Sequence, residues 1–287
     1  MLKILAAVGA LAVVAGGVLV FQFATTAMAS SRARTESVVL LESIRGQSND
    51  ADGALRSLPT FDASADLAKE KQSADQYASL LGGDRTIVQA GEVKLRADRD
   101  RLANQASSLL ALPFRPGLDH ERTRAEAMLS ALQAADTGLG IEVDQMKAVS
   151  AIFDAEASFD TLLNDHLDKK DVPGAIALFP TLDSKLKTAA QLAGGPNTPP
   201  QARKLVGNLQ TLSTDLDAFL VAAQRRDAVT VLALEPKVDA DATALENFDT
   251  QGLDAYEKTL LQPYEDRYDA GVRAAGFTPV SEPTTTS

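Results

Sequence analysis

The chain contains no cysteine, no tryptophan and only two histidines among its 287 residues. The lack of cysteine excludes disulfide frameworks, thiolate zinc sites, iron–sulfur clusters and cysteine nucleophiles. Aromatic residues make up only 5% of the chain, whereas hydrophobic residues make up 45%, with alanine and leucine recurring throughout. Because alanine and leucine lose least on entering a helix, this composition predicts an all-α protein with a sizeable core.

No motif for catalysis or cofactor binding stands out in the sequence. It has no Gly-x-Ser-x-Gly elbow, no glycine-rich phosphate loop after a strand and no Asn-x-Ser/Thr acceptor. The stretch nearest to an anion loop is Gly-Gly-Asp-Arg at residues 82–85, which indicates a helix break because no strand precedes it. We therefore nominate no catalytic, cofactor-binding or metal-ligating residue and expect no cofactor.

Neither histidine belongs to a metal-binding pattern. His120 and His166 both lack the Glu-x-x-His or His-x-x-x-His spacing that places two ligands on one helix face. His120 is expected to be exposed at a helix start. His166 follows an apolar stripe and is expected to be partly buried and hydrogen-bonded, with a role as a ligand or pH switch as the alternative.

Acidic residues dominate the charge of the chain, which is −11 overall. This charge argues against a nucleic-acid partner, since such binding depends on clustered lysine and arginine. Between residues 227 and 269 there are eleven acidic residues against three basic ones. A solvated face is the preferred interpretation, and a surface for a cation or a basic partner is the alternative. Carboxylate pairs are too frequent to nominate a catalytic acid and base: Asp154/Glu156, Asp165/Asp168, Asp239/Asp241.

The N-terminal segment predicts entry into a membrane. Residues 4–23 hold one polar side chain, Gln22, and are long enough as a helix to cross a bilayer. Ala27-Met28-Ala29 follows, which is the small-x-small pattern that a signal peptidase accepts. We favour a retained signal-anchor helix within residues 1–29, with cleavage after Ala29 and a secreted or periplasmic product as the alternative.

Orientation in the membrane follows less directly from charge. Arg32 and Arg34 after the apolar run compete with Lys3 before it under the positive-inside rule. The cleavage-site pattern and the short leading segment favour export of the bulk of the chain. We therefore expect the protein in the cell envelope, on its extracytoplasmic face, with a cytoplasm-facing anchored scaffold as the topological alternative.

Residues 30–150 are expected to form an N-terminal helical part. Helical periodicity predicts one helix over residues 38–58, a second ending at Gly82-Gly83 and a third running to Leu112. In the third, Val88, Leu95, Leu102 and Leu109 recur every seven residues, but polar companions favour a bundle helix over a coiled coil. After a turn at residues 113–119, one long helix or two stacked ones follow, and the glycines of Gly138-Leu139-Gly140 favour a kink or short break.

Residues 151–276 contain an internal repeat. Residues 169–183 (KKDVPGAIALFPTLD) align without gaps to residues 225–239 (RRDAVTVLALEPKVD). In each copy, two cations suit the end of one helix and the next residue, Asp171 or Asp227, suits the N-cap of another. A shared proline, Pro180 or Pro236, is expected to bend the second helix. We predict a helical hairpin of about 56 residues, duplicated inside one bundle rather than extended into an array.

Two further signals bound this region. Gly194-Gly195 ends one helix, and Thr198-Pro199-Pro200-Gln201 predicts a capping-box start for the next. Residues 252–276 predict a last helix that Pro263 splits or restarts, and the tyrosines on it are interpreted as packing residues rather than a ligand stripe: Tyr256, Tyr264, Tyr268. Residues 277–287 are expected to form a disordered polar tail.

These patterns favour a membrane-tethered, extracytoplasmic helical interaction or scaffold protein without catalytic activity. Its layout is similar in architecture to extracytoplasmic sensor and adaptor bundles, a likeness that carries no functional residue with it. The expected partners are the lipid bilayer through residues 4–23 and a protein partner or a second copy. The alternative is a small-ligand-binding or sensor bundle of the cell envelope acting through a partner, and an enzyme or metal protein using carboxylates and tyrosines is a third hypothesis.

Overall fold

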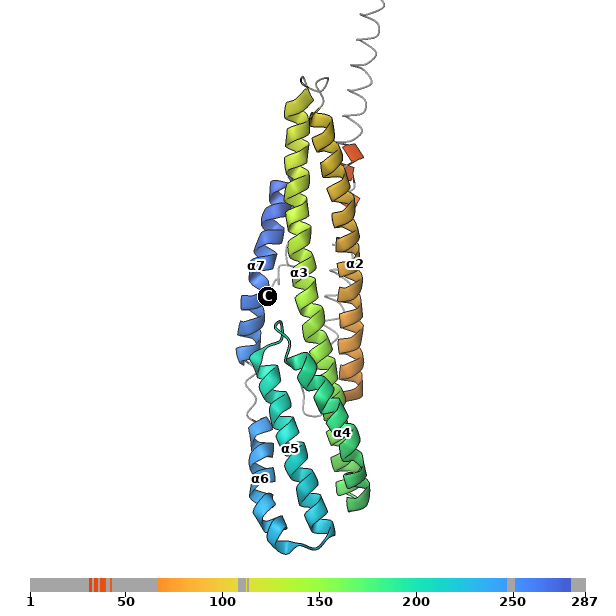
Figure 1. Cartoon of the computed structure of the whole chain (residues 1–287), viewed down its shortest axis with the longest axis vertical. Helices are drawn as coiled ribbons and strands as arrows, with labels where there is room; N and C mark the ends of the chain where they lie inside the picture. The colour runs from red at the N-terminus through yellow and green to blue at the C-terminus, as the bar shows by residue number, and fades with distance from the viewer. Residues whose placement is uncertain are drawn as a thin grey trace, which may run out of the picture. The chain divides into compact units, whose positions relative to one another are not determined.

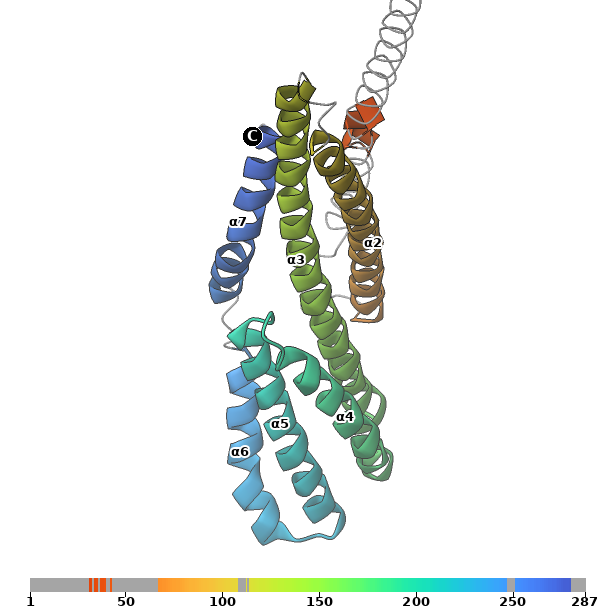
Figure 2. The same cartoon turned by 45° about the horizontal axis from the view of Figure 1, so that its top comes forward.

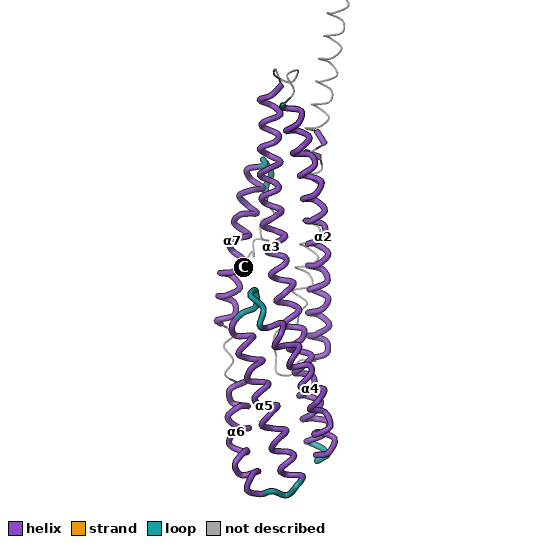
Figure 3. Tube along the Cα trace, viewed as in Figure 1, coloured by secondary structure: helices purple, strands orange, loops and turns teal. Residues whose placement is uncertain are grey.

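The computed structural model describes residues 31–32, 34–35, 37–39, 42, 67–107, 112, 114–246 and 251–279. Every long element in this part of the chain is helical, and no strand occurs in it (Figures 1 and 3). The prediction of an all-α fold is confirmed. The elements are α2 (Leu67–Ala106), α3 (Arg115–Asp160), the π-helix η2 (Thr161–Leu167), α4 (Val172–Ala193), α5 (Pro200–Gln224), α6 (Ala228–Glu246) and α7 (Gln251–Ala274).

The chain divides into two compact units. Unit 1 comprises Met1–Ser48, Asp84–Gly138 and Tyr264–Ser287, and unit 2 comprises Asn49–Gly83 and Leu139–Pro263. The long helices α2 and α3 each contribute one part to each unit.

The predicted membrane segment and most of the first predicted helix lie outside the described residues. The disordered tail expected over residues 277–287 is wrong at its start, because the Phe277 amide donates to the Val272 carbonyl at 3.0 Å and its ring lies against Arg124. Residues from 280 onward lie outside the described residues. Among the helices that are described, none has a stretch both long and apolar enough to cross a membrane.

The helix breaks predicted at glycine pairs are not observed. The single helix α2 runs through Gly82 and Gly83, and α3 runs unbroken through Gly138 and Gly140. Each internal glycine costs a helix about 1 kcal/mol relative to alanine. Burial of neighbouring side chains such as Leu81 outweighs this cost, because burying one leucine contributes about 2 kcal/mol.

The stripe of α2 with a seven-residue spacing faces the core of unit 1. Val88, Leu95 and Leu102 are fully buried, and Leu102 packs with Ala106 and Leu118 of α3. The polar companion Asp98 is buried as well and forms an ion pair with Arg101 at 2.8 Å. The seven-residue spacing therefore belongs to a bundle helix whose buried face also contains a carboxylate, that of Asp98.

Helix α7 approaches α3 closely in unit 1. A Cβ added to Gly271 would lie 2.7 Å from the backbone oxygen of Ala127, so only glycine fits this contact. Arg124 of α3 donates a hydrogen bond to the backbone oxygen of Ala275 at 2.9 Å and stacks over the ring of Phe277. Pro263 lies inside α7 without splitting it, and the three tyrosines of α7 are half-buried, as packing residues are.

In unit 2, α5 lies between α4 and α6 (Figure 2). The main core cluster combines side chains from the end of α3, η2, α4 and α5, with Leu162, Leu182 and Leu186 almost fully inaccessible to solvent. We call the part of α3 from Leu139 onward, η2 and α4 the first hairpin, and α5 with α6 the second hairpin.

Candidate functional site

The repeat predicted from the sequence has the same turn in both hairpins. Lys170 and Arg226 adopt the left-handed region at φ 60° and 57°. The amide of Asp171 donates to the His166 carbonyl at 2.8 Å, and the amide of Asp227 donates to the Ala222 carbonyl at 3.0 Å. These matching hydrogen bonds close the C-terminus of the first helix in each hairpin and satisfy its last carbonyl groups.

Both predicted aspartate caps are confirmed. The Asp171 carboxylate accepts a hydrogen bond from the Gly174 amide at 3.0 Å, and the Asp227 carboxylate accepts one from the Thr230 amide at 3.2 Å. The hydrogen bonds to these carboxylates hold the pKa of each well below its usual value; the main donors are the His166 ring and the Thr230 hydroxyl, respectively. The caps fix the start of α4 and of α6.

The capping box predicted at Thr198 is wrong. Pro199 occupies the N-cap position of α5, and no side chain caps the helix. The Thr198 hydroxyl instead donates to the Leu192 carbonyl at 3.1 Å, at the end of the preceding helix. The same carbonyl also accepts a hydrogen bond from the Gly195 amide at 3.1 Å, so the Thr198 hydroxyl helps to close the end of α4 and does not cap the start of α5. The early proline in α5 is confirmed.

The first hairpin differs from the second by the π-helix before its turn. In η2 the amide of Asp168 donates to the Leu163 carbonyl, five residues back, at 3.0 Å. This wide turn brings His166 to Asp171, with Nδ1 and Oδ2 2.8 Å apart. The prediction of a half-buried, hydrogen-bonded His166 is confirmed. The second hairpin has Ala222 at the corresponding place.

The π-helix also shifts the alignment of the two hairpins by one residue. After the turn, equivalent residues lie 56 positions apart, as in Asp171 and Asp227. Before it, the buried residues match at 57 positions: Phe159 with Leu216 and Ile152 with Leu209. A π-helical turn holds one more residue than an α-helical one, which accounts for the shift.

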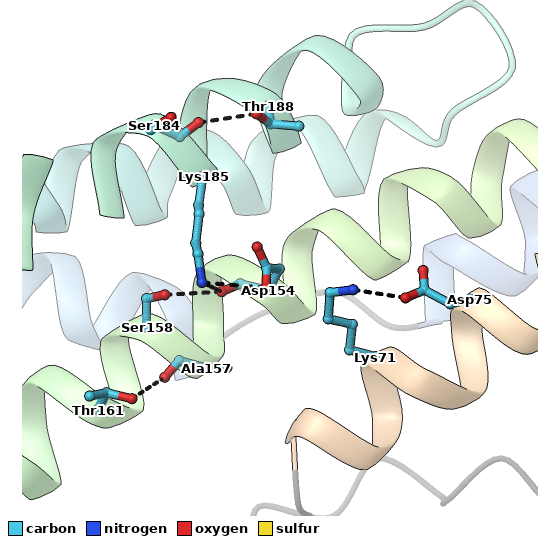
Figure 4. A network of polar contacts seen from close by, with 9 residues as sticks. All are labelled: Lys71, Asp75, Asp154, Ala157, Ser158, Thr161, Ser184, Lys185 and Thr188. Atoms are coloured by element: carbon cyan, nitrogen blue, oxygen red, sulfur yellow. Dashed lines mark hydrogen bonds and ion pairs between the residues drawn. The ribbon is translucent and has the colours of Figure 1, made fainter. Parts of the chain in front are cut away.

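Ion pairs and a hydrogen bond form a polar network on three helices of unit 2 near the middle of the first hairpin (Figure 4). Lys185 of α4 reaches the Asp154 carboxylate of α3 at 3.4 Å, and Lys71 of α2 pairs with Asp75 at 2.7 Å. The Ser150 hydroxyl donates to Asp75 at 2.5 Å. One ion pair therefore joins α3 to α4, and the Ser150 hydrogen bond joins α2 to α3. Ion pairs as exposed as these contribute at most about 1 kcal/mol each.

Two further carboxylates lie close to this network. Burial raises the pKa of Glu156 to about 7, and the negative charge of Glu70 contributes to the same shift. Glu70 is itself buried, and one of its carboxylate oxygens has no hydrogen-bond partner. Burial raises the pKa of Glu70 too. Glu156 is thus an acid that gains or loses its proton near neutral pH, where ordinary glutamates are fully ionised.

The other residues weighed from the sequence are not drawn together. His120 is exposed, Asp165 pairs with Lys169 at 2.8 Å, and Asp239 is exposed on α6. Burial raises the pKa of Asp241, with a smaller effect from the neighbouring Asp215. Within the described ranges, no group of three or more histidine, aspartate or glutamate side chains is arranged to hold a metal ion.

The exposed side of α6 carries an apolar strip. Val229 and Leu232 are 80% and 69% exposed. Ala233, Pro236 and Ala240 are exposed along the same side, at three- and four-residue spacings. We call these five residues the α6 strip. Large exposed apolar side chains that recur at helical spacing are typical of interaction surfaces.

The equivalent side of α4 is also largely exposed, at Pro173, Ala177, Pro180 and Ser184. The neighbouring face of α4 belongs to the core: Phe179 and Leu186 are buried on it, whereas their counterparts Glu235 and Ala242 on α6 are exposed. Leu232 is the counterpart of Ile176, which packs against the core cluster of unit 2. Where this core face of α4 meets the exposed side, α6 thus keeps an apolar side chain, Leu232, and has a carboxylate, Glu235, in place of the buried Phe179.

A small pocket in unit 1 is lined by two arginines, one glutamate and an aromatic ring. Its lining residues are Arg34, Ser37, Glu121, Arg124, Ala125 and Phe277. Its accessible volume is about 10 Å³, which is room for about one water molecule. The Arg124 guanidinium there is engaged by Glu121 and by Ala275, a structural role that ties α3 to the end of α7.

No protein-family model, no curated protein and no solved structure matches this chain. The carboxylate pair Glu70 and Glu156 and the α6 strip were not found from the sequence. Glu156 stands between Ala155 and Ala157 and close to Phe159, which is the one sequence signal of its partial burial. The strip follows a regular helical spacing but does not differ in sequence from a core-facing stripe.

Proposed function

We propose that this chain is a membrane-tethered, extracytoplasmic helical interaction or scaffold protein without catalytic activity. The α6 strip is the observation that carries this proposal, because it exposes large apolar side chains on the last helix of the repeat. Terminal helices of stacked helical hairpins usually present a polar outer face to water. An apolar strip at this position supports a surface that a partner covers.

The tether rests on the apolar run at residues 4–23, which is long enough for a membrane-spanning helix. Retention would leave the helical body beside the membrane, and cleavage after Ala29 would release it into the periplasm or medium. Sequencing of the mature N-terminus together with membrane fractionation separates the two forms. Protease accessibility in spheroplasts separates either form from a cytoplasm-facing one.

The interaction is tested by photo-crosslinking in intact cells. A photoreactive amino acid replaces Ala233 in the α6 strip or Ala177, its exposed counterpart on α4. Both sites are small and exposed, so the matched pair controls for accessibility of the probe. We expect a discrete crosslinked product from position 233 and none from position 177. Equal products from both sites, or none from position 233, would contradict the proposal.

A further inference from the structure

Leu232, within the α6 strip, is flanked by acidic side chains. Glu235 and Asp239 are exposed and follow Leu232 at three and seven residues, which places them along one edge of the strip. Lys237 follows the opposite edge. Helix α6 with its cap, residues 227–246, has five acidic residues against one basic residue, so the field around α6 is negative.

The same sector of α4 shows what this surface replaces. Ile176 and Phe179 are packed there, on a helix that has η2 and α5 as neighbours. On α6 the corresponding pair is Leu232 and Glu235, one apolar and one charged. A helix that packed on α6 in this sector would need an apolar side chain against Leu232 and a cation against Glu235 and Asp239.

The geometry points to a positively charged amphipathic helix of a partner protein as the occupant of the α6 strip. The inference rests on the proposed function and names the chemistry of its partner. A second copy of this chain fits less well, since two α6 helices would bring Glu235 and Asp239 of both copies together. The strip is also a single helix face with only two large side chains, Val229 and Leu232, whereas each partner in a stable dimer buries roughly 800 Å² with about 20 residues or more. An anionic membrane surface would be repelled by the same carboxylates.

The test uses the full chain in nanodiscs of zwitterionic lipid and a synthetic probe. The probe is a fluorescent helical peptide of about 18 residues with leucines on one face and lysines beside them. Its two controls are the same peptide with glutamate in place of lysine and a scrambled sequence of the same composition. Binding is followed by fluorescence polarisation after subtraction of the signal from protein-free nanodiscs.

We expect the cationic amphipathic peptide to bind and both control peptides to fail. Leu232→Gln should weaken binding about tenfold, because it removes the central apolar contact. The double variant Glu235→Gln, Asp239→Asn should weaken it about threefold and reduce its dependence on salt between about 0.05 and 0.3 M. Val93→Gln, at a 70% exposed valine of α2, is the matched control and should leave binding unchanged.

Equal binding of the glutamate peptide, or equal losses in Val93→Gln and Leu232→Gln, would overturn the inference. So would self-association in sedimentation experiments that Leu232→Gln abolishes, or binding to anionic vesicles that depends on Leu232. A crosslink from position 233 in cells without binding of the cationic peptide leaves the proposed function standing and refutes the charge of the partner. Failure of the crosslink refutes the proposed function itself.

Discussion

The first and second hairpins of unit 2 end their leading helices in the same way and then differ in how much of the following helix they bury. Lys170 and Arg226 share a left-handed backbone, and Asp171 and Asp227 share a capping role. Helix α4 buries Phe179 and Leu186, but α6 exposes the residues at both equivalent places. The local hydrogen bonds of the turn are therefore duplicated, while the packing faces have followed their different surroundings.

This comparison separates two contributions to the fold. The turn is specified by residues close in sequence, which act through backbone hydrogen bonds in either copy. The buried arc of each helix is specified by the helices around it, and α4 has η2 on one side and α5 on another. A duplicated segment can thus keep its turn and convert a core face into an exposed one.

The largest expected effect comes from exchanging equivalent residues between the hairpins. Phe179→Glu places the residue of the second hairpin into the core of the first and should destabilise the protein by about 4 kcal/mol or more, since the charge would be buried without a partner. The reverse change, Glu235→Phe, should alter stability by less than about 0.5 kcal/mol. Urea unfolding followed by circular dichroism measures both. Similar losses for the two variants would contradict the difference in burial.

The half-buried glutamate of the first hairpin provides the next largest effect. Glu156 stands where the second hairpin has Ser213, and its pKa is raised from 4.5 to about 7. The native state therefore holds this proton more tightly than the unfolded state, and stability falls as pH rises from 4.5 to 7. Glu156→Gln should stabilise the protein by about 3 kcal/mol above pH 7 and have little effect near pH 4. Unfolding experiments from pH 4 to above pH 7 test whether the stabilisation by Glu156→Gln increases with pH. A gain that is independent of pH would point to packing instead of ionisation.

The two aspartate caps should contribute equally to thermal stability, although each carboxylate has a different side-chain partner. Asp171→Ala and Asp227→Ala should each lower Tm by on the order of 3 °C, through loss of a hydrogen bond to the start of α4 or α6. Because both carboxyl pKa values are lowered in the native state, this stabilisation is present above pH 3.8 and is lost as pH falls through the native pKa.

NMR titration measures the pKa of Asp171 and of Asp227 separately, and so shows which side chain acts on each cap. His166→Ala should raise the pKa of Asp171 and leave that of Asp227 unchanged, whereas Thr230→Val should do the opposite. Coupled changes at both aspartates would show that the two turns are not independent.

The smallest effect is expected at the left-handed residues of the turns. Lys170→Gly and Arg226→Gly relieve the strain of a side chain at positive φ and should each stabilise the protein by about 0.5 kcal/mol. Equal gains, measured by thermal unfolding, support a common turn. A loss at either position would mean that the lysine or arginine side chain contributes more than the strain it imposes.

Much of the local structure could be predicted from the sequence. The all-α class, the repeated turn, both aspartate caps, the internal Pro180 and Pro236 and the hydrogen-bonded His166 all depend on contacts within a few residues. Such contacts leave a direct trace in spacing and composition.

The remainder depends on neighbours distant in sequence. Gly82 and Gly83 do not end α2, because tertiary packing outweighs intrinsic helix propensity. The π-helix inserts one residue, so the repeat was found only from residue 169 onward. The burial of Glu156 and the exposure of Leu232 follow from which helices pack nearby, which periodicity alone does not contain.

The most direct test compares thiol labelling at the two equivalent exposed alanines, using the natural absence of cysteine. Ala177→Cys and Ala233→Cys variants are treated with a membrane-permeant maleimide, first as purified protein and then in intact cells. The purified variants should label at similar rates, because both sites are exposed. In cells, labelling at position 233 should slow about tenfold relative to position 177, as a partner covers the α6 strip. Equal labelling of the two sites in cells would contradict the central claim that this face is an interaction surface.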